Sequence, residues 1–169
     1  FLCLEQESSL FTGFLTSYRR SVISMLRQNN LNLYYPQELV SKKVRASLCK
    51  SAKINLNIPQ RSDWPWLSLM RVIAALQLGK ATVSLGTKDT SKISLCCYQL
   101  DINENTYHAL AEYINNWEKI YEDCFNAYNM MAAKYAAHNP FPHYLFEYWS
   151  LTDKHLINKR KSLLEHHER

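Results

Sequence analysis

Glycine is scarce in this 169-residue chain, which has only Gly13, Gly79 and Gly86. No two of them lie close enough to form a glycine-rich phosphate loop, so the sequence lacks that motif. Proline is also rare, with five residues, while leucine, alanine and long polar residues dominate. This composition favours helices joined by short turns.

Cysteine pairs with the spacing of zinc sites or redox motifs are absent. The five cysteines are Cys3, Cys49, Cys96, Cys97 and Cys124. A core of this size needs no covalent cross-links, so we expect reduced thiols and a cytoplasmic location. The pairs His108–Glu112 and His143–Glu147 are spaced four residues apart, as on a helix. The apolar spacing that starts at Tyr107 and Leu110, however, places the first pair on the flank of its helix. We therefore expect no metal and no cofactor.

Long hydrophobic runs are missing as well. The most apolar stretch, residues 64–78, is interrupted by Arg71 and is shorter than the roughly 18 residues that a membrane span needs. We therefore expect no membrane segment. The sequence also has no strand-turn-helix nucleophile motif, so we expect no enzyme.

Acidic residues are nearly absent from the first third of the chain. Residues 8–62 contain nine basic side chains but only one acid, Glu38, whereas residues 63–169 contain eleven bases and twelve acids. The net charge of +5 therefore belongs to the first third. Such a local excess of positive charge indicates an anionic partner.

The fold class predicted from the sequence is mainly α. The apolar spacing predicts a single helical domain over residues 1–169, a bundle of about five helices around a long central helix, with residues 165–169 set apart as a tail. The expected helices are residues 4–27, 37–53, 63–79, 107–135 and 143–164. A seam of mostly aromatic residues, spaced three and four apart from Tyr107 to Tyr135, marks the central helix and predicts that Trp117 is buried.

Residues 81–100 break the helical pattern. Val83 and Leu85 alternate with polar residues, turn residues follow from Gly86, and Ile93 and Leu95 alternate again. This pattern predicts one β-hairpin inserted in the bundle.

The helix predicted over residues 37–53 is the most suggestive element for function. Val40, Val44 and Leu48 form an apolar stripe, and four lysines gather on the opposite side. The first hypothesis is a non-catalytic protein that binds DNA or RNA through the phosphate backbone, without sequence readout, as an accessory subunit of a nucleoprotein complex. Its predicted contact residues are Lys42, Lys43, Arg45, Lys50, Lys53, Arg20 and Arg27.

A second hypothesis stays open beside the first. In it the protein is an adaptor, secretion chaperone or regulator that binds a protein partner through the aromatic seam or the edge of the hairpin. The two hypotheses differ in what the surface must show. An adaptor needs an exposed apolar patch, whereas nucleic-acid binding needs basic residues from separate helices on one face.

Overall fold

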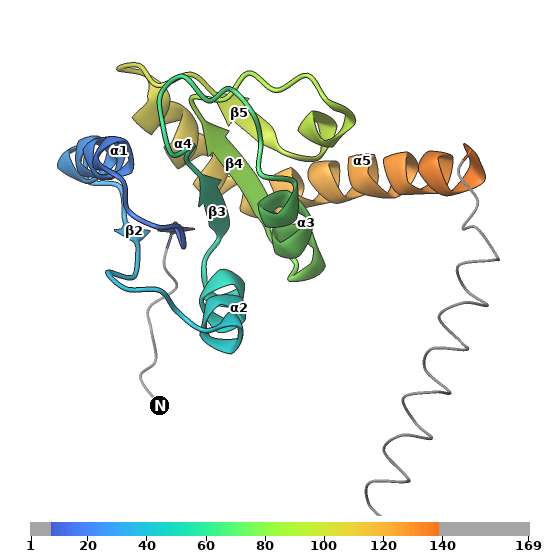
Figure 1. Cartoon of the computed structure of the whole chain (residues 1–169), viewed down its shortest axis with the longest axis horizontal. Helices are drawn as coiled ribbons and strands as arrows, with labels where there is room; N and C mark the ends of the chain where they lie inside the picture. Colours follow the sequence, from blue (N-terminus) through green and yellow to red (C-terminus); the bar gives the residue numbers. More distant parts are fainter. Residues whose placement is uncertain (1–7, 139–169) are drawn as a thin grey trace, which may run out of the picture. The chain divides into compact units, whose positions relative to one another are not determined.

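The computed structural model describes residues 8–138, and its centre is a sheet of five parallel strands in the order β2-β1-β3-β4-β5. The strands β3 and β4 run side by side in the same direction at the centre of Figure 1. The strands are β1 (Ser9–Leu10), β2 (Leu33–Tyr34), β3 (Ile54–Asn57), β4 (Ala81–Leu85) and β5 (Tyr98–Leu100).

Helices connect successive strands, as parallel pairing requires. They are α1 (Ser17–Gln28), α2 (Lys42–Ser51), α3 (Leu69–Gln77), the 3-10 helix η1 (Lys92–Cys96), α4 (Thr106–Asn115) and α5 (Trp117–His138). This alternation defines a doubly wound α/β fold, so the prediction of a mainly helical bundle is wrong. In the observed strand order the chain first moves from β1 outward to β2, then returns past β1 to β3.

The predicted hairpin over residues 81–100 is also wrong. Val83 of β4 pairs with Tyr98 of β5 in a parallel register. The connection through η1 returns the chain to the end of the sheet at which β4 begins, so both strands run in the same direction. Alternation of apolar and polar residues marks a strand with two unlike faces but does not specify its neighbour. The polar residues Thr82 and Ser84 are buried, so here the alternation does not separate core from solvent.

The predicted helix bounds change for local reasons. The helix expected over residues 4–27 begins only at Ser17, where the Thr16 side chain caps it, because the preceding residues form β1. The second helix is confined to Lys42–Ser51. The third starts at Leu69 and stops before Gly79, whose φ of +77° is the left-handed conformation that ends helices.

The predicted central helix over residues 107–135 is divided at Asn116. The Asn116 side chain and backbone N–H both donate to the Glu112 carbonyl, which ends α4 before Trp117 begins α5. Trp117 is half-buried rather than fully buried, with the Lys80 Nζ 4.0 Å from its ring centre. The helix expected over residues 143–164 lies outside the described residues.

The core lies on both faces of the sheet. One cluster joins α1 and α4, through residues such as Leu26 and Leu110, to Ile54, Leu56 and Val83 of the sheet. A second joins α3 and η1 to α5, and a smaller third joins α2 and α3 to β1. The described residues up to Met131 belong to one compact unit, while residues 132–138, the end of α5, are assigned to another. The prediction of a single domain over residues 1–169 stays a prediction.

Among the described residues, no helix is both long and apolar enough to cross a membrane.

The parallel sheet and the hairpin predict different effects of two leucine truncations. Leu85 in β4 is fully buried and Leu95 in η1 is 71% exposed, whereas a hairpin makes them equivalent inward residues. We expect Leu85→Ala to lower the free energy of unfolding by about 2–5 kcal/mol and Leu95→Ala by less than about 0.5 kcal/mol. Urea unfolding measures both, and equal losses would contradict the parallel arrangement.

Candidate anion-binding site

The loop after β1 is built around the buried ring of Phe11. A Cβ atom added to Gly13 would lie 2.4 Å from the Phe11 Cζ and 2.8 Å from an Arg71 guanidinium nitrogen, so only glycine fits there. At the end of the loop, the Thr16 hydroxyl donates to the Gln60 carbonyl at 2.9 Å. The loop is therefore fixed at its start by packing and at its end by a bond to the segment after β3.

Arg19 holds the same two segments together from the first turn of α1. Its Nε donates to the Ile58 carbonyl at 2.8 Å and to the Pro59 carbonyl at 3.2 Å, and its Nη1 donates to the Phe14 carbonyl at 2.8 Å. The side chain is buried, and burial lowers the pKa of its guanidinium. These three bonds, which we call the Arg19 bracket, connect the carboxyl ends of β1 and β3.

Arg71, on α3, reaches the same ring. The guanidinium carbons of Arg19 and Arg71 lie 5.2 and 5.3 Å from the centre of the Phe11 ring. Burial, followed by the charges of Arg19 and Arg45, lowers the pKa of Arg71 to about 10. The charges of Arg19 and Arg45 therefore both disfavour the charged form of Arg71, and we call Arg19, Arg45 and Arg71 the arginine cluster.

No carboxylate neutralises the arginine cluster within residues 8–138. The ion pairs Arg61–Asp63 and Lys88–Asp101, in that part of the chain, involve none of the three arginines. Arg45 is exposed, but Arg19 is buried and Arg71 is half-buried, and uncompensated charges removed from water raise the free energy of the folded state. A bound anion would remove this electrostatic cost.

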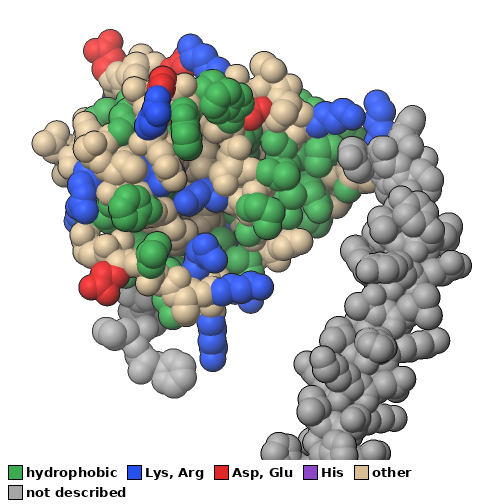
Figure 2. Space-filling model, in the orientation of Figure 1, with side chains coloured by type: hydrophobic (Ala, Val, Ile, Leu, Met, Phe, Trp, Pro, Cys, Tyr) green, Lys and Arg blue, Asp and Glu red, His purple; other side chains and the backbone are tan. Residues whose placement is uncertain are grey.

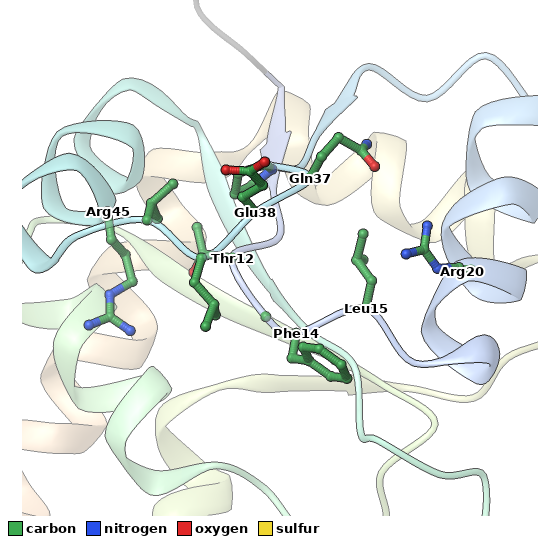
Figure 3. A pocket seen from close by; sticks show the side chains of 11 residues that line it. Thr12, Phe14, Leu15, Arg20, Gln37, Glu38 and Arg45 are labelled. Carbon is green, nitrogen blue, oxygen red and sulfur yellow. The ribbon is translucent and has the colours of Figure 1, made fainter.

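A pocket of about 130 Å³, open to solvent, lies beside the cluster at the carboxyl ends of β1 and β2. Arg20 from α1 and Arg45 from α2 lie on opposite sides of it, with Thr12 and Glu38 between them (Figure 3). Gly13 also lines the pocket and connects it to Arg71. The pocket is large enough for a small anionic group but not for a whole dinucleotide.

Hydrogen-bonded side chains fix the neighbouring strand ends. The Asn57 amide donates to the Ser84 hydroxyl at 2.8 Å, and the Thr87 hydroxyl lies 2.8 Å from that oxygen and 2.9 Å from the Gln99 Oε1. These bonds join β3, β4 and β5 on the carboxyl side of the sheet. The pocket, in contrast, is lined by the loops after β1 and β2.

The seven basic residues predicted from the sequence lie on α1, on α2 and just after α2. Arg20 and Arg45 line the pocket, whereas Arg27 lies at the far end of α1 with its guanidinium carbon 5.6 Å from the centre of the Tyr35 ring. Lys42, Lys43 and Lys50 are exposed on α2. Lys53 follows the end of the helix and is half-buried.

The apolar stripe predicted on α2 also needs correction. Val44 is 46% exposed, and the buried side chain of α2 is that of Cys49. Helical periodicity placed the stripe one residue away from the side that packs, because this short helix has few apolar residues to define a face. Arg45 consequently falls at the pocket.

Sequence reasoning missed Arg19, Arg71 and Gly13 as site residues. Arg71 was noted only as an interruption of an apolar run, and Arg19 only as part of the charge count. The signal that could have found the site was the succession of a short apolar strand, a lone glycine and a threonine cap over residues 9–16. That succession was instead interpreted as part of the first helix.

Exposed apolar side chains surround the basic residues. Figure 2 shows basic side chains on the face with α2 and α3, with hydrophobic side chains around them. The exposed large apolar residues include Phe14, Leu39, Trp66, Leu69 and Met70. The adaptor hypothesis stays a prediction, but the hairpin edge it named does not exist.

Comparison with known proteins adds no family assignment: no protein-family model matches the chain, and no curated protein sequence matches it significantly.

The bracket formed by Arg19 leads to a prediction about stability. Lysine keeps the charge but cannot bond all three carbonyls from a planar group, so we expect Arg19→Lys to lower the free energy of unfolding by about 1–3 kcal/mol. The matched control is Arg20→Lys, the exposed neighbour, which we expect to change it by less than about 0.5 kcal/mol. Urea denaturation measures both variants, and an unchanged midpoint for Arg19→Lys would contradict the bracket.

Proposed function

We propose that this protein is a binding domain for a small phosphate-bearing ligand, held at the carboxyl edge of its parallel sheet. The observation that carries the proposal is the arginine cluster without a described carboxylate partner, next to a pocket that Arg20 and Arg45 line. Arginine suits this role because its planar group bonds phosphate oxygens in pairs and always carries charge.

The position of the pocket in the fold supports the proposal. In open α/β sheets, ligands bind beyond the carboxyl ends of the strands, near the place where the strand order reverses. Here that place is between β1 and β3, and the pocket borders it on the β1 side, where the loops after β1 and β2 line it. This support is an analogy at the level of fold, so the chemistry of the arginines carries the greater weight.

Inorganic phosphate is the simplest probe of the proposed site. We expect phosphate to raise the melting temperature more than chloride at equal ionic strength, because it binds the folded state alone. Arg45→Gln should weaken phosphate binding about tenfold, the loss of one charge-assisted bond. Calorimetric titration gives the affinities.

The control for Arg45→Gln is Lys50→Gln, which removes one exposed charge from the same helix but not from the pocket. We expect Lys50→Gln to bind phosphate as the unaltered protein does. Equal weakening by both variants would show a diffuse effect of net charge, and no stabilisation by phosphate would overturn the proposal.

A second candidate function is the sequence-independent nucleic-acid binding that the charge distribution predicts. The exposure of Lys42, Lys43 and Lys50 on one helix favours it. Phosphate backbones bind such residues by releasing counterions, without needing a pocket. We place this function second because Arg27 and Lys53, which it also invoked, lie apart from the exposed lysines or are half-buried.

Salt dependence tests the second candidate. If Lys42, Lys43 and Lys50 neutralise three phosphates, the slope of log affinity against log salt on a DNA duplex should be about −2.7. Replacing all three by glutamate should abolish binding while phosphate still binds the pocket. Fluorescence anisotropy with mixed-sequence DNA and RNA measures this, and no binding at 50 mM salt would exclude it.

The cellular location belongs to the same set of proposals. The four described cysteines, Cys49, Cys96, Cys97 and Cys124, are buried free thiols. Free thiols persist in reducing compartments, which supports a cytoplasmic location.

A further inference from the structure

Large apolar side chains are exposed in the first turn of α3 and in the loop before it. They are Trp66, Leu69 and Met70, and no residue from 64 to 70 carries a charge. None of the three packs into the clusters of the core. Apolar side chains that gather on the surface in this way mark a site for a binding partner.

The loop that presents Trp66 is held in place by bonds to its backbone. The Pro65 carbonyl accepts a bond from the Lys88 N–H at 2.9 Å, and the Leu67 N–H donates to the Asp89 carboxylate at 2.8 Å. Trp66 lies between these two anchored residues. An exposed side chain on a backbone that is already ordered loses little entropy when a partner covers it.

The apolar side chains adjoin the arginine cluster. Arg71 directly follows Met70 on α3, and its guanidinium lies close to Gly13, which lines the pocket. After burial and the charge of Arg19, the charge of Arg45 also lowers the pKa of Arg71, so Arg45 lies nearby. Figure 2 shows basic side chains among hydrophobic ones on the face with α2 and α3. The pocket and the start of α3 are therefore neighbours, with arginines between them.

The size of the pocket and the charges of the loop narrow the kind of ligand. A volume of about 130 Å³ holds one phosphate group, so the rest of a larger ligand must lie on the surface outside. A polyanion such as DNA needs a series of unpaired cations there. The one base among residues 61–70 is Arg61, which already pairs with Asp63. The surface therefore suits a ligand with a single phosphate and apolar groups.

We propose that this ligand is a phosphorylated segment of a partner protein, with its phosphate in the pocket beside Arg45 and its flanking apolar side chains on the start of α3. The inference rests on the proposed phosphate-binding function and adds the class of ligand. Arginine clusters bind phosphorylated residues through charge-assisted hydrogen bonds. The uncharged patch of Trp66, Leu69 and Met70 then selects the residues beside the phosphate.

Degenerate peptide libraries test this assignment. Each library has one fixed phosphoserine, phosphothreonine or phosphotyrosine among random residues, and the bound peptides are sequenced. We expect enrichment of large apolar residues beside the phosphorylated residue. In fluorescence anisotropy the most enriched peptide should bind at least about tenfold more tightly than its unphosphorylated form, which lacks the charge-assisted bonds.

Met70→Ser gives the sharper test. Met70 is 73% exposed and does not line the pocket. Its replacement should weaken binding of the enriched phosphopeptide about fivefold and leave inorganic phosphate unchanged, because only an apolar contact is lost. The matched control is Met130→Ser on α5, which alters a methionine that is 72% exposed and should change neither affinity. Arg45→Gln should weaken binding of both ligands, and circular dichroism checks that the variants fold.

The outcomes distinguish the inference from the function on which it rests. Equal binding of phosphorylated and unphosphorylated peptides, no enrichment of apolar residues, or equal effects of Met70→Ser and Met130→Ser would overturn the peptide assignment and leave phosphate binding in place. Tighter binding to phosphoinositide vesicles or to single-stranded DNA than to the enriched phosphopeptide would overturn it too. Failure of both inorganic phosphate and the phosphopeptides to bind would overturn the inference and the proposed function together.

Discussion

The buried guanidinium of Arg19 is the interaction on which the functional edge of the sheet depends. It bonds the Phe14 carbonyl after β1 and the Ile58 and Pro59 carbonyls after β3, and its guanidinium carbon lies 5.2 Å from the centre of the Phe11 ring. These strands are neighbours in the sheet, and β1 is only two residues long. So short a strand offers few ladder bonds, and the bonds from the Arg19 side chain add to the pairing of β1 with β3. The bond from Arg19 to the Phe14 carbonyl also fixes the loop after β1, which lines the pocket.

The same bracket explains why the site is positively charged. Arg19 is needed for its geometry, and its charge is present at every physiological pH. Arg71 also lies near the Phe11 ring. Its burial, followed by the charges of Arg19 and Arg45, lowers the pKa of Arg71 to about 10. Arg19 and Arg71 thus share one aromatic ring. An anion bound to Arg45, as we propose, would lower the repulsion on Arg71 and so stabilise the folded state.

Sequence reasoning identified the charge but not the architecture that organises it. The excess of basic residues over residues 8–62 included Arg20 and Arg45, which line the pocket, among the candidates. The fold was missed because β1 and β2 have two residues each, too few for any period to appear. The alternation at Val83 and Leu85 was recognised as a strand, but its parallel partner lies fifteen residues away, beyond η1. Local pattern specifies the element, and packing of distant segments specifies the neighbour.

The unbroken aromatic seam from Tyr107 to Tyr135 shows the same limit from the helical side. Its spacing is helical in both α4 and α5, so periodicity alone gives no reason to divide it. The break comes from Asn116, whose amide caps the Glu112 carbonyl and whose backbone leaves the helical conformation. After the break, α5 packs against α3 and η1 through Ile120 and Cys124, whereas Leu110 and Ile114 of α4 pack in the cluster of α1. One asparagine therefore lets a single apolar pattern serve two separate parts of the core.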